Sequence, residues 1–348
     1  MAENGLKWYE RSGNSAGVVC STRVRLARNL QRQPFPARAS LEQKTQVAQL
    51  AKAALLDGNS VLSREFHFLP MEELTPEEAV SLAERRLVSQ EFVSDRQGKA
   101  LLALEDESVS IMINEEDHLR IQVLREGLAL KEAAETASRI DTLLGENLDF
   151  AFDPEFGYLT QCPTNLGTGM RASVALHLPA LTEAGSMPRI AANLSKLGLA
   201  LRGAFGEGSR AVGDVYQLSN QITLGLSESQ AIENLSSIAG QLIDEERRLR
   251  QEMKENPAWQ DKVARAAGTL KTARLLSGSE AMELLSLARA GVSAGLLAGV
   301  ELGAFNQLNM RVQPATLMVE AGRRLEEQER DQLRAKLVRE ALAPLRVE

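Results

Sequence analysis

The sequence predicts an α+β fold, in which a region of mixed strands and helices is followed by a C-terminal domain of helices alone. Apolar residues alternate with other residues through 101–123, which is typical of strands joined by short turns. From Ser227 onward they recur at helical spacing instead. A length of 348 residues is sufficient for two domains. We therefore expect one domain over residues 1–254 and a helical domain over residues 258–348.

The first domain should contain a helix followed by three adjacent strands. Thr75-Pro76-Glu77-Glu78 predicts a helix start, because threonine can cap, proline suits the first turn and Glu78 can complete a capping box. Residues 101–104 and 109–113 form a predicted hairpin around the acidic turn 105–107. The alternation at residues 119–123 predicts a third strand.

Three helices are predicted in the rest of the chain. Ser227 and Gln230 have capping-box spacing, and the helix that they begin should end near Pro257. Ser277 and Glu280 repeat that spacing and predict a second helix start. The last helix is amphipathic, with apolar residues at Leu333, Leu337, Val338 and Ala341.

Composition excludes several classes of protein. A net charge of −7 argues against a nucleic-acid scaffold, and residues 290–300 are too few and too rich in glycine to span a membrane. The charged N-terminus is not a signal peptide, and Cys20 and Cys162 lack disulfide-framework spacing, so we expect a cytoplasmic protein. The three histidines show no metal-ligand spacing, and we expect no protein-held metal site.

Closely spaced arginines in residues 20–28 indicate an anion site. Arg23 and Arg25 would point to the same face of a strand. Two adjacent guanidinium groups repel each other unless an anion lies between them, and a phosphate group matches their geometry. The alternative is a solvated strand face with extended arginine side chains.

Three further segments carry candidate functional residues. Residues 114–120 place three acids in succession before Arg120, at a strand junction where they could form only a polar turn. Residues 159–171 form a glycine-containing loop that allows close approach of a ligand but lacks the Walker lysine. Residues 202–209 contain three glycines around a single carboxylate, Glu207, which is typical of a mobile loop.

In this order and at this separation, the four segments resemble the catalytic domain of the ATP:guanidino phosphotransferases, the family of creatine and arginine kinases. The strings Asn-Glu-Glu-Asp-His-Leu-Arg at residues 114–120 and Cys-Pro-Thr-Asn-Leu-Gly-Thr-Gly-Met-Arg at residues 162–171 are its hallmarks. The resemblance extends over residues 17–253. It implies an antiparallel β-sheet flanked by helices and the transfer of a phosphoryl group from ATP to a guanidino nitrogen.

The resemblance assigns roles to individual residues. Glu116 matches the catalytic carboxylate, Glu207 matches a second substrate carboxylate of arginine-specific members, and Cys162 matches the reactive cysteine, with a buried structural thiol as its alternative. Mg²⁺ would be held mainly through the ATP phosphates. The positions that match nucleotide-contacting segments are Ser21, Thr22, Arg23, Val24, Arg25, Arg86, Arg120, Arg171, Ala172, Ser173, Val174, Arg202, Gly203 and Gly206.

Two positions depart from the family pattern on the adenine side. Arg86 stands where the family usually has a nucleotide-contacting histidine, and Gln217 stands where creatine kinases carry an aspartate. Recognition of the base is therefore expected to differ from the family pattern more than recognition of the phosphates does.

The chain is most similar in plan to the bacterial protein-arginine kinases. Almost nothing precedes the predicted catalytic domain, whereas small-substrate members carry a helical domain there, and this chain adds helices after residue 258. The resemblance implies arginine in proteins as the acceptor, an activator or adaptor protein, a link to stress response and Clp-type degradation, and a homodimer. Free arginine as the acceptor, or a non-catalytic phosphoarginine-binding module, are the alternatives.

The tail contains a further string of that group, Arg-Asp-x-x-Arg-Ala. The resemblance assigns allosteric phosphoarginine binding to Arg330, Asp331, Arg334 and Ala335. Arg330 and Arg334 would share one helix face and could clasp a phosphoryl group. An exposed helix with alternating charges is the alternative.

Overall fold

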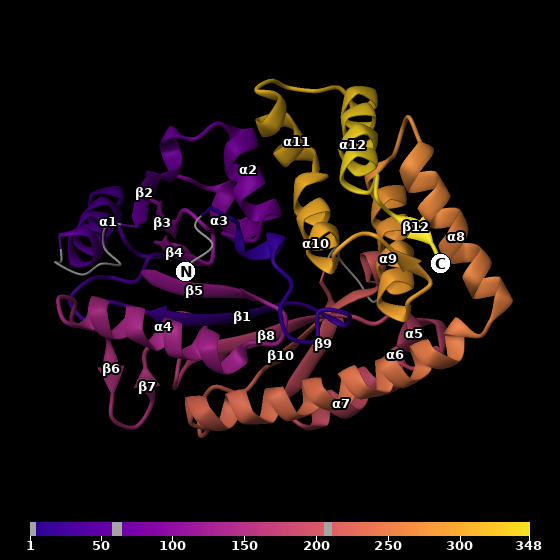
Figure 1. The fold of residues 1–348 in the computed structure, drawn as a ribbon. Helices are drawn as coiled ribbons and strands as arrows, with labels where there is room; N and C mark the ends of the chain where they lie inside the picture. The colour runs from indigo at the N-terminus through magenta and orange to yellow at the C-terminus, as the bar shows by residue number, and fades with distance from the viewer. Residues whose placement is uncertain (1–4, 58–64, 205–210) are drawn as a thin grey trace.

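The structure is a computed structural model that describes residues 5–57, 65–204 and 211–348. Its centre is an eight-stranded sheet in the order β2-β3-β4-β5-β1-β8-β10-β9, with every neighbouring pair antiparallel (Figure 1). The strands of this sheet are β1 (Val19–Arg28), β2 (Phe66–Pro70), β3 (Ala100–Leu104), β4 (Val109–Ile113), β5 (Leu119–Glu126), β8 (Met170–His177), β9 (Leu199–Gly203) and β10 (Val215–Asn220). The predicted hairpin and third strand are confirmed as β3, β4 and β5.

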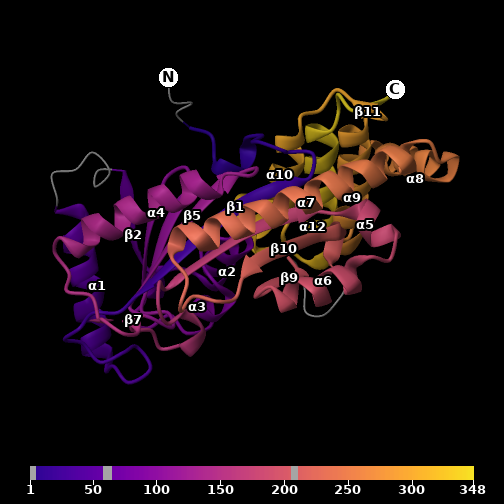
Figure 2. The same cartoon turned by 90° about the horizontal axis from the view of Figure 1, so that it is seen from below.

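Three long helices cover one face of the sheet and bury the main apolar core. Figures 1 and 2 show α4 and α7 lying across the strands on this face. The core residues beneath them include Val24, Ile121 and Val174, all of which are fully buried. The helices of this layer are α1 (Leu41–Leu56), α4 (Leu130–Gly145) and α7 (Glu228–Lys254).

Smaller elements complete the first part of the chain. The helix α2 starts at the predicted cap, where Thr75 and Glu78 form a capping box. A short hairpin, β6 (Phe152–Asp153) and β7 (Gly157–Tyr158), projects beyond the sheet in Figure 1. The remaining helices are α2 (Pro76–Glu84), α3 (Gln90–Ser94), α5 (Pro179–Glu183) and α6 (Met187–Lys196), with one-turn helices η1 (Trp8–Glu10), η3 (Met71–Glu73), η4 (Pro163–Asn165) and η5 (Val212–Asp214).

The C-terminal helices have an apolar core of their own, which contains Trp259, Leu285, Phe305 and Val338. The predicted caps at Ser227 and Ser277 are present, and α7 ends at Lys254 as expected. The helices are α8 (Pro257–Thr272), α9 (Gly278–Ala294), α10 (Leu302–Arg311), α11 (Pro314–Ala321) and α12 (Glu327–Ala341).

The expectation of helices alone after Ser227 needs one correction. Two-residue strands β11 (Leu297–Ala298) and β12 (Arg346–Val347) pair in antiparallel fashion. Segments this short carry no detectable alternation, and the pairing closes only because the end of the chain returns beside the turn after α9.

Candidate active site

The predicted phosphate-binding arginines come together on the face of the sheet opposite α4 and α7. Directly paired residues of antiparallel strands share a face. Arg25 on β1 is paired with Arg171 on β8, and Ala27 on β1 is paired with Arg120 on β5. At the far edge, Gln217 on β10 is paired with Arg202 on β9. Period-two alternation along the strands therefore aligns residues that lie far apart in the sequence.

The arginine cluster is electrostatically unfavourable without an anion. Burial is the main factor that lowers the pKa of Arg23, followed by the positive charges of Arg25, Arg86, Arg120 and Arg171. Burial, Arg120 and Arg171 likewise lower the pKa of Arg25 to about 10, although Glu115 and Glu116 act in the opposite direction. A polyphosphate would supply the missing negative charge, and its oxygens match the guanidinium donors.

Glu116 lies beside this cluster in the tight turn between β4 and β5. Asn114 adopts a left-handed conformation with φ of 62°, and its side-chain amide donates to the carbonyls of Lys44 and Gly98, each at 2.7 Å. Arg120 donates to Glu116 at 3.0 Å and to Glu115 at 2.9 Å. The turn thus directs two carboxylates toward the arginine-bearing face.

Asp117 and His118 fix this turn against neighbouring loops. Asp117 accepts hydrogen bonds from the Asn29 side chain at 2.6 Å and from the backbone of Gln161 at 2.7 Å. His118 Nδ1 accepts from the backbone of Leu30, so its Nε2 carries the proton and donates to the Pro34 carbonyl. Burial lowers the pKa of His118. Both residues therefore position Glu116 rather than face the pocket.

A pocket of about 160 Å³ brings the two hallmark strings together. Cys162 is half-buried, and its sulfur lies 3.1 Å from the hydroxyl of Thr164. Asn165 is buried, and its Oδ1 has no hydrogen-bond partner among the residues that the structure describes. Sequence reasoning missed Asn165 as a site residue, although it lies inside a hallmark string. The lining residues are Arg25, Ala27, Glu116, Arg120, Cys162, Asn165, Gly169 and Arg171.

A second, narrower hollow lies farther along the same face of the sheet. Arg23 donates to Gln217 Oε1 at 2.8 Å, so the residue that departs from the family pattern holds a phosphate-side arginine in place. Arg86 has a left-handed backbone with φ of 68°, and burial lowers its pKa. The hollow is lined by Ser21, Arg23, Arg86, Leu124, Ser173, Ala175 and Gln217.

Four of the residues predicted to contact the nucleotide have side chains that point away from the arginine-bearing face, so any contact that they make with a nucleotide would come from their backbone. Val24, Ala172 and Val174 are fully buried in the core beneath α4 and α7. Thr22 donates its hydroxyl to the Gly127 carbonyl on that same side. Because successive residues of a strand point to opposite faces, these side chains cannot reach a ligand that lies on the arginine-bearing face.

The loop that should cover the acceptor is only partly described. Glu207 and Gly206 lie outside the described residues. Arg202 and Gly203, at the end of β9, lead into that loop. Burial is the main factor that lowers the pKa of Arg171, and the positive charge of Arg202 acts in the same direction. After the loop, Asp214 accepts a hydrogen bond from Ser286 on α9 at 3.0 Å.

The tail string does not form the expected phosphoryl clasp in this structure. Arg334 is buried and donates to the carbonyls of Val312 and Leu276 as well as to Asp331. Ala335 is fully buried, and Arg330 donates to the Leu325 carbonyl. The two arginines share a helix face, but the packing of α12 directs the Arg334 guanidinium into the interior.

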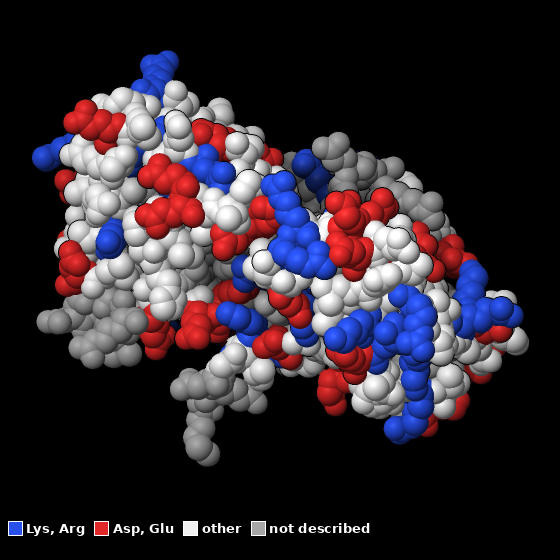
Figure 3. All heavy atoms as spheres, turned by 90° about the horizontal axis from the view of Figure 1, so that it is seen from above, with Lys and Arg blue, Asp and Glu red and all other residues white. Residues whose placement is uncertain are grey.

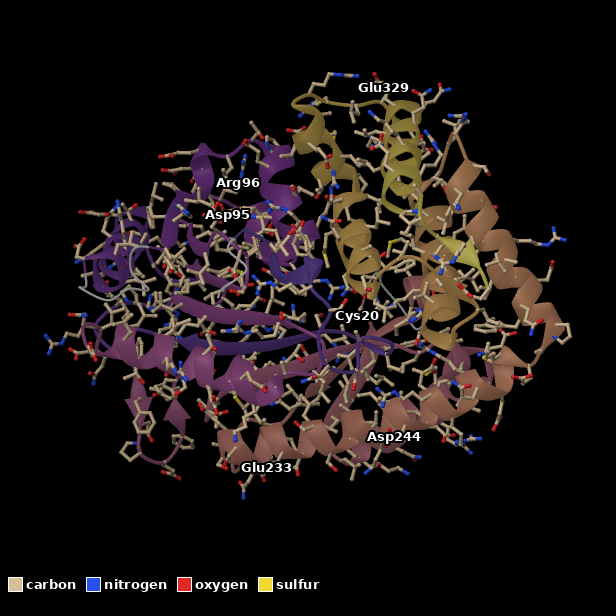
Figure 4. The ribbon with its side chains drawn as sticks, in the orientation of Figure 1. Cys20, Asp95, Arg96, Glu233, Asp244 and Glu329 are labelled. Atoms are coloured by element: carbon tan, nitrogen blue, oxygen red, sulfur yellow. The ribbon has the colours of Figure 1, made fainter. Side chains whose placement is uncertain are left out.

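Sequence reasoning missed a buried polar network that joins the sheet to the C-terminal helices. His177 at the end of β8 contacts Ser286 on α9 at 2.9 Å, and Arg250 on α7 donates to the His177 carbonyl at 2.7 Å. Glu246 pairs with Arg250 at 2.6 Å and caps α5. Figure 4 shows Cys20 near this junction, between the sheet and the C-terminal helices. None of the network residues lies in a recognisable sequence motif. The network becomes apparent only when β8, α7 and α9 pack together.

No group of three or more His, Cys, Asp or Glu residues in the described ranges could hold a metal ion. Within those same ranges, no helix is both long and apolar enough to cross a membrane. Basic and acidic side chains are interspersed on the face seen in Figure 3.

An arginine-lined sheet face beside a positioned glutamate and a cysteine defines a phosphotransferase of the guanidino kinase class. A family model for the ATP:guanido phosphotransferase C-terminal catalytic domain matches residues 46–249, and one for the protein-arginine kinase McsB C-terminal domain matches residues 256–348. The chain therefore belongs to the protein-arginine kinase family and is a kinase.

Relatives and solved structures agree with this assignment. The chain is 44% identical over 344 residues to a protein-arginine kinase of Moorella thermoacetica, covering 98% of both chains. It is 45% identical over 323 residues to one from Caldanaerobacter subterraneus subsp. tengcongensis, covering 92% of this chain and 96% of that one. A crystal structure of lombricine kinase matches with a TM-score of 0.60 and 25% identity, over 71% of this chain and 73% of the other.

Proposed function

We propose that this protein transfers the γ-phosphoryl group of ATP to arginine side chains of proteins. The observation that carries the proposal is the single pocket in which Glu116, Cys162 and the arginines Arg25, Arg120 and Arg171 meet. A guanidino acceptor fits the carboxylate side of this pocket, and a phosphate chain fits the arginine side.

In the proposed mechanism the arginine cluster binds and orients the phosphates. Phosphoryl transfer has a loose transition state, so fixed positive charge around the moving group supplies much of the catalysis. Mg²⁺, when bound with ATP, would neutralise further charge on the phosphates. Arg25 and Arg171 lie in register on adjacent strands and therefore contribute without rearrangement of the backbone.

Glu116 is the proposed acceptor-side base. Its carboxylate would take two N–H bonds of the substrate guanidinium and aim the third nitrogen at the γ-phosphorus. The nitrogen lone pair forms the N–P bond, the bond from phosphorus to the ADP oxygen breaks, and the guanidinium proton passes to Glu116. In the structure Glu116 accepts from Arg120 at 3.0 Å, so the substrate guanidinium would share this carboxylate with Arg120. Glu207 would supply a second carboxylate from the adjoining loop, and Cys162 would lie beside the acceptor.

We infer a catalytic domain over residues 1–254 and a helical regulatory and dimerisation domain over residues 258–348. In the second domain, residues 330–335 would bind phosphoarginine after the Arg334 side chain leaves the carbonyls of Val312 and Leu276. We further infer a cytoplasmic homodimer that acts with an activator protein in stress response and Clp-type degradation. The resemblance to bacterial protein-arginine kinases supports these inferences.

The test is mass spectrometry of an unfolded arginine-containing protein and free arginine, incubated together with this protein and Mg-ATP at neutral or alkaline pH. Acid must be avoided because the N–P bond is acid-labile. Phosphate on protein arginines alone is the expected result. Phosphate on free arginine alone would instead make the protein a small-molecule guanidino kinase. Binding of ATP without transfer to either acceptor would favour a non-catalytic phosphoarginine-binding module.

A further inference from the structure

Exposed apolar side chains occur on three segments that lie against the loop that carries Cys162, or against one another. Five of the eleven large apolar residues that are exposed in the described part of the chain come from three short segments here. Scattered exposed apolar residues are ordinary, but a contiguous group marks an interaction surface. We call this group the apolar rim; its members are Phe152, Phe156, Leu197, Ile222 and Leu224.

Backbone contacts make the three segments of the apolar rim continuous. Gly157 of the β6–β7 hairpin forms a bridge with Gly167 of the Cys162 loop. A Cβ atom on Gly167 would lie 2.9 Å from the Leu224 Cα atom, so the loop and the 222–224 segment are in close contact. A Cβ atom on Gly198 would lie 2.5 Å from Ile222 Cδ1, which places Leu197 and its turn at the other end.

The apolar rim is built directly on the loop that carries Cys162. Thr223, between two rim residues, donates its hydroxyl to the Thr164 carbonyl at 3.0 Å and to the Leu166 carbonyl at 2.7 Å. The Thr164 side chain in turn contacts the Cys162 sulfur at 3.1 Å. An acceptor arginine that reaches Cys162 therefore brings the residues on either side of it next to the rim.

The base of the rim is rigid. The Tyr158 ring packs edge-on against Phe152 at 5.2 Å between ring centroids, and the Arg28 guanidinium lies 3.5 Å from the centre of the Tyr158 ring. Arg28 is buried and paired with Asp141 at 2.8 Å. The exposed Phe152 ring is thus packed against a fixed neighbour before any ligand binds, which reduces the entropy lost on binding.

We propose that the apolar rim binds apolar side chains of the substrate polypeptide that flank the target arginine. This inference rests on the proposed transfer to protein arginines. The occupant is the substrate chain because the rim adjoins the acceptor pocket, and a polypeptide that inserts an arginine must cross the surface around that pocket. Burying such side chains against the rim adds affinity for the peptide without changing the reacting groups, so the rim lowers KM and leaves kcat alone.

The test measures the phosphorylation of two peptides by the parent protein, by a rim variant and by a control variant. Each peptide has one central arginine; in one it is flanked by leucine and phenylalanine, and in the other by glycine and serine. The rim variant combines Phe156→Ser with Leu224→Ser, whose side chains are 44% and 47% exposed and outside the catalytic pocket. The matched control is Leu275→Ser, which is 49% exposed and lies between α8 and α9. KM and kcat are measured with Mg-ATP, and light scattering gives the oligomeric state.

The parent is expected to show a KM about tenfold lower for the apolar peptide, and the rim variant should lose this preference at unchanged kcat, whereas the control keeps it. Equal KM values for both peptides in the parent would overturn the rim proposal while leaving the proposed function intact. An altered oligomeric state in the rim variant would instead make the rim a contact between copies. Phosphorylation of neither peptide by the parent would count against the proposed function itself.

Discussion

Arg120 holds the Glu116 carboxylate in place before a substrate binds. Arg120 donates to both Glu116 and Glu115, and Ser89 donates to Glu115 at 2.6 Å. The pairing keeps Glu116 oriented in the absence of an acceptor. A substrate guanidinium would add further donors to the same carboxylate, since each carboxylate oxygen accepts more than one hydrogen bond.

Replacing Glu116 should impair chemistry far more than nucleotide binding. The Glu116→Gln variant keeps the size of the side chain but cannot accept the proton, so kcat should fall by about 10²–10⁴-fold. The Kd for Mg-ATP, measured by calorimetry, should change by less than about threefold, because the phosphates contact the arginine side. The exposed Glu105→Gln serves as control. An unchanged kcat would remove Glu116 from the mechanism.

The arginine cluster lowers the stability of the folded protein when no anion is bound. The folded-state pKa of Arg25, about 10, lies below the ordinary value of an arginine side chain. Above about pH 10 the unfolded state therefore binds more protons than the folded state, so this destabilisation is complete below pH 10 and is relieved as the pH rises above it. At neutral pH the free enzyme carries the full destabilisation, and an anion removes part of it.

Removing one charge from the cluster should therefore stabilise the protein without nucleotide. Arg25→Met should raise the free energy of unfolding by on the order of 1 kcal/mol, since buried charges are often replaced favourably by apolar groups. The same variant should lose most of the thermal stabilisation that Mg-ATP gives the parent. Thermal melts with and without Mg-ATP measure both effects. Arg32→Met, on an exposed side chain, should change neither, and a destabilised Arg25→Met would contradict the account.

At the scale of helices and strands, the sequence predicted those elements whose stabilising interactions lie within a few residues of one another. The capping boxes at Thr75 and Ser227 begin α2 and α7 as expected, because a cap depends on residues within one turn. The β3–β4 hairpin follows from alternation and an acidic turn. The order of the sheet does not, since β1 pairs with β5 and β8 through contacts more than 90 residues apart.

The one-turn helix η5 follows the segment that contains Glu207 and packs against α9 of the C-terminal helices. Gly213 and Asp214 both have left-handed backbones, with φ of 62° and 53°. A Cβ atom on Gly213 would lie 3.1 Å from the Met282 carbonyl oxygen of α9. Asp214 accepts from Ser286 on that same helix. The segment that follows the loop is thus fixed by α9.

Two glycine substitutions should have opposite effects for this reason. Gly213→Ala should lower the free energy of unfolding by about 1–2 kcal/mol, because alanine disfavours the left-handed region, and should reduce kcat by disturbing the adjoining loop. Gly240→Ala is the control: it lies inside α7 with open space around it and should stabilise by about 0.5–1 kcal/mol. Denaturant melts and steady-state rates test both. A tolerated Gly213→Ala would show that η5 readily adopts another geometry.

At the scale of the whole molecule, a carboxylate of the first part of the chain caps a helix of the last part. Glu84 at the end of α2 accepts from the backbone of Ala315 at 2.9 Å and from the backbone of Thr316 at 2.7 Å. Ser81 and Thr316 also contact each other through their hydroxyls at 3.1 Å. An acidic group at a helix N-terminus satisfies free N–H groups and complements the helix dipole.

Removing this cap should weaken the connection between the two parts of the chain. Glu84→Ala should lower the free energy of unfolding by about 1–2 kcal/mol and broaden or split the thermal transition, because α11 loses its cap while both apolar cores remain. Glu233→Ala, on the exposed face of α7 in Figure 4, should leave the melt unchanged. Differential scanning calorimetry distinguishes these outcomes. A single transition at the parent's temperature would contradict the role of Glu84.

The sequence was sufficient to predict the class of fold, the helix starts at Thr75, Ser227 and Ser277 and the segments that carry the candidate site, because caps, alternation and the two hallmark strings are local patterns. It could not determine which way the arginine of the tail points, since Arg334 is turned inward by contacts with Val312 and Leu276. Nor could it show that the side chains of Val24 and Val174 lie on the opposite face of the sheet from the neighbouring arginines. That difference depends on which face of the sheet α4 and α7 cover. The polar network around His177 and Arg250 and the apolar rim likewise arise only where distant segments meet, and that meeting depends on long-range packing rather than on local sequence.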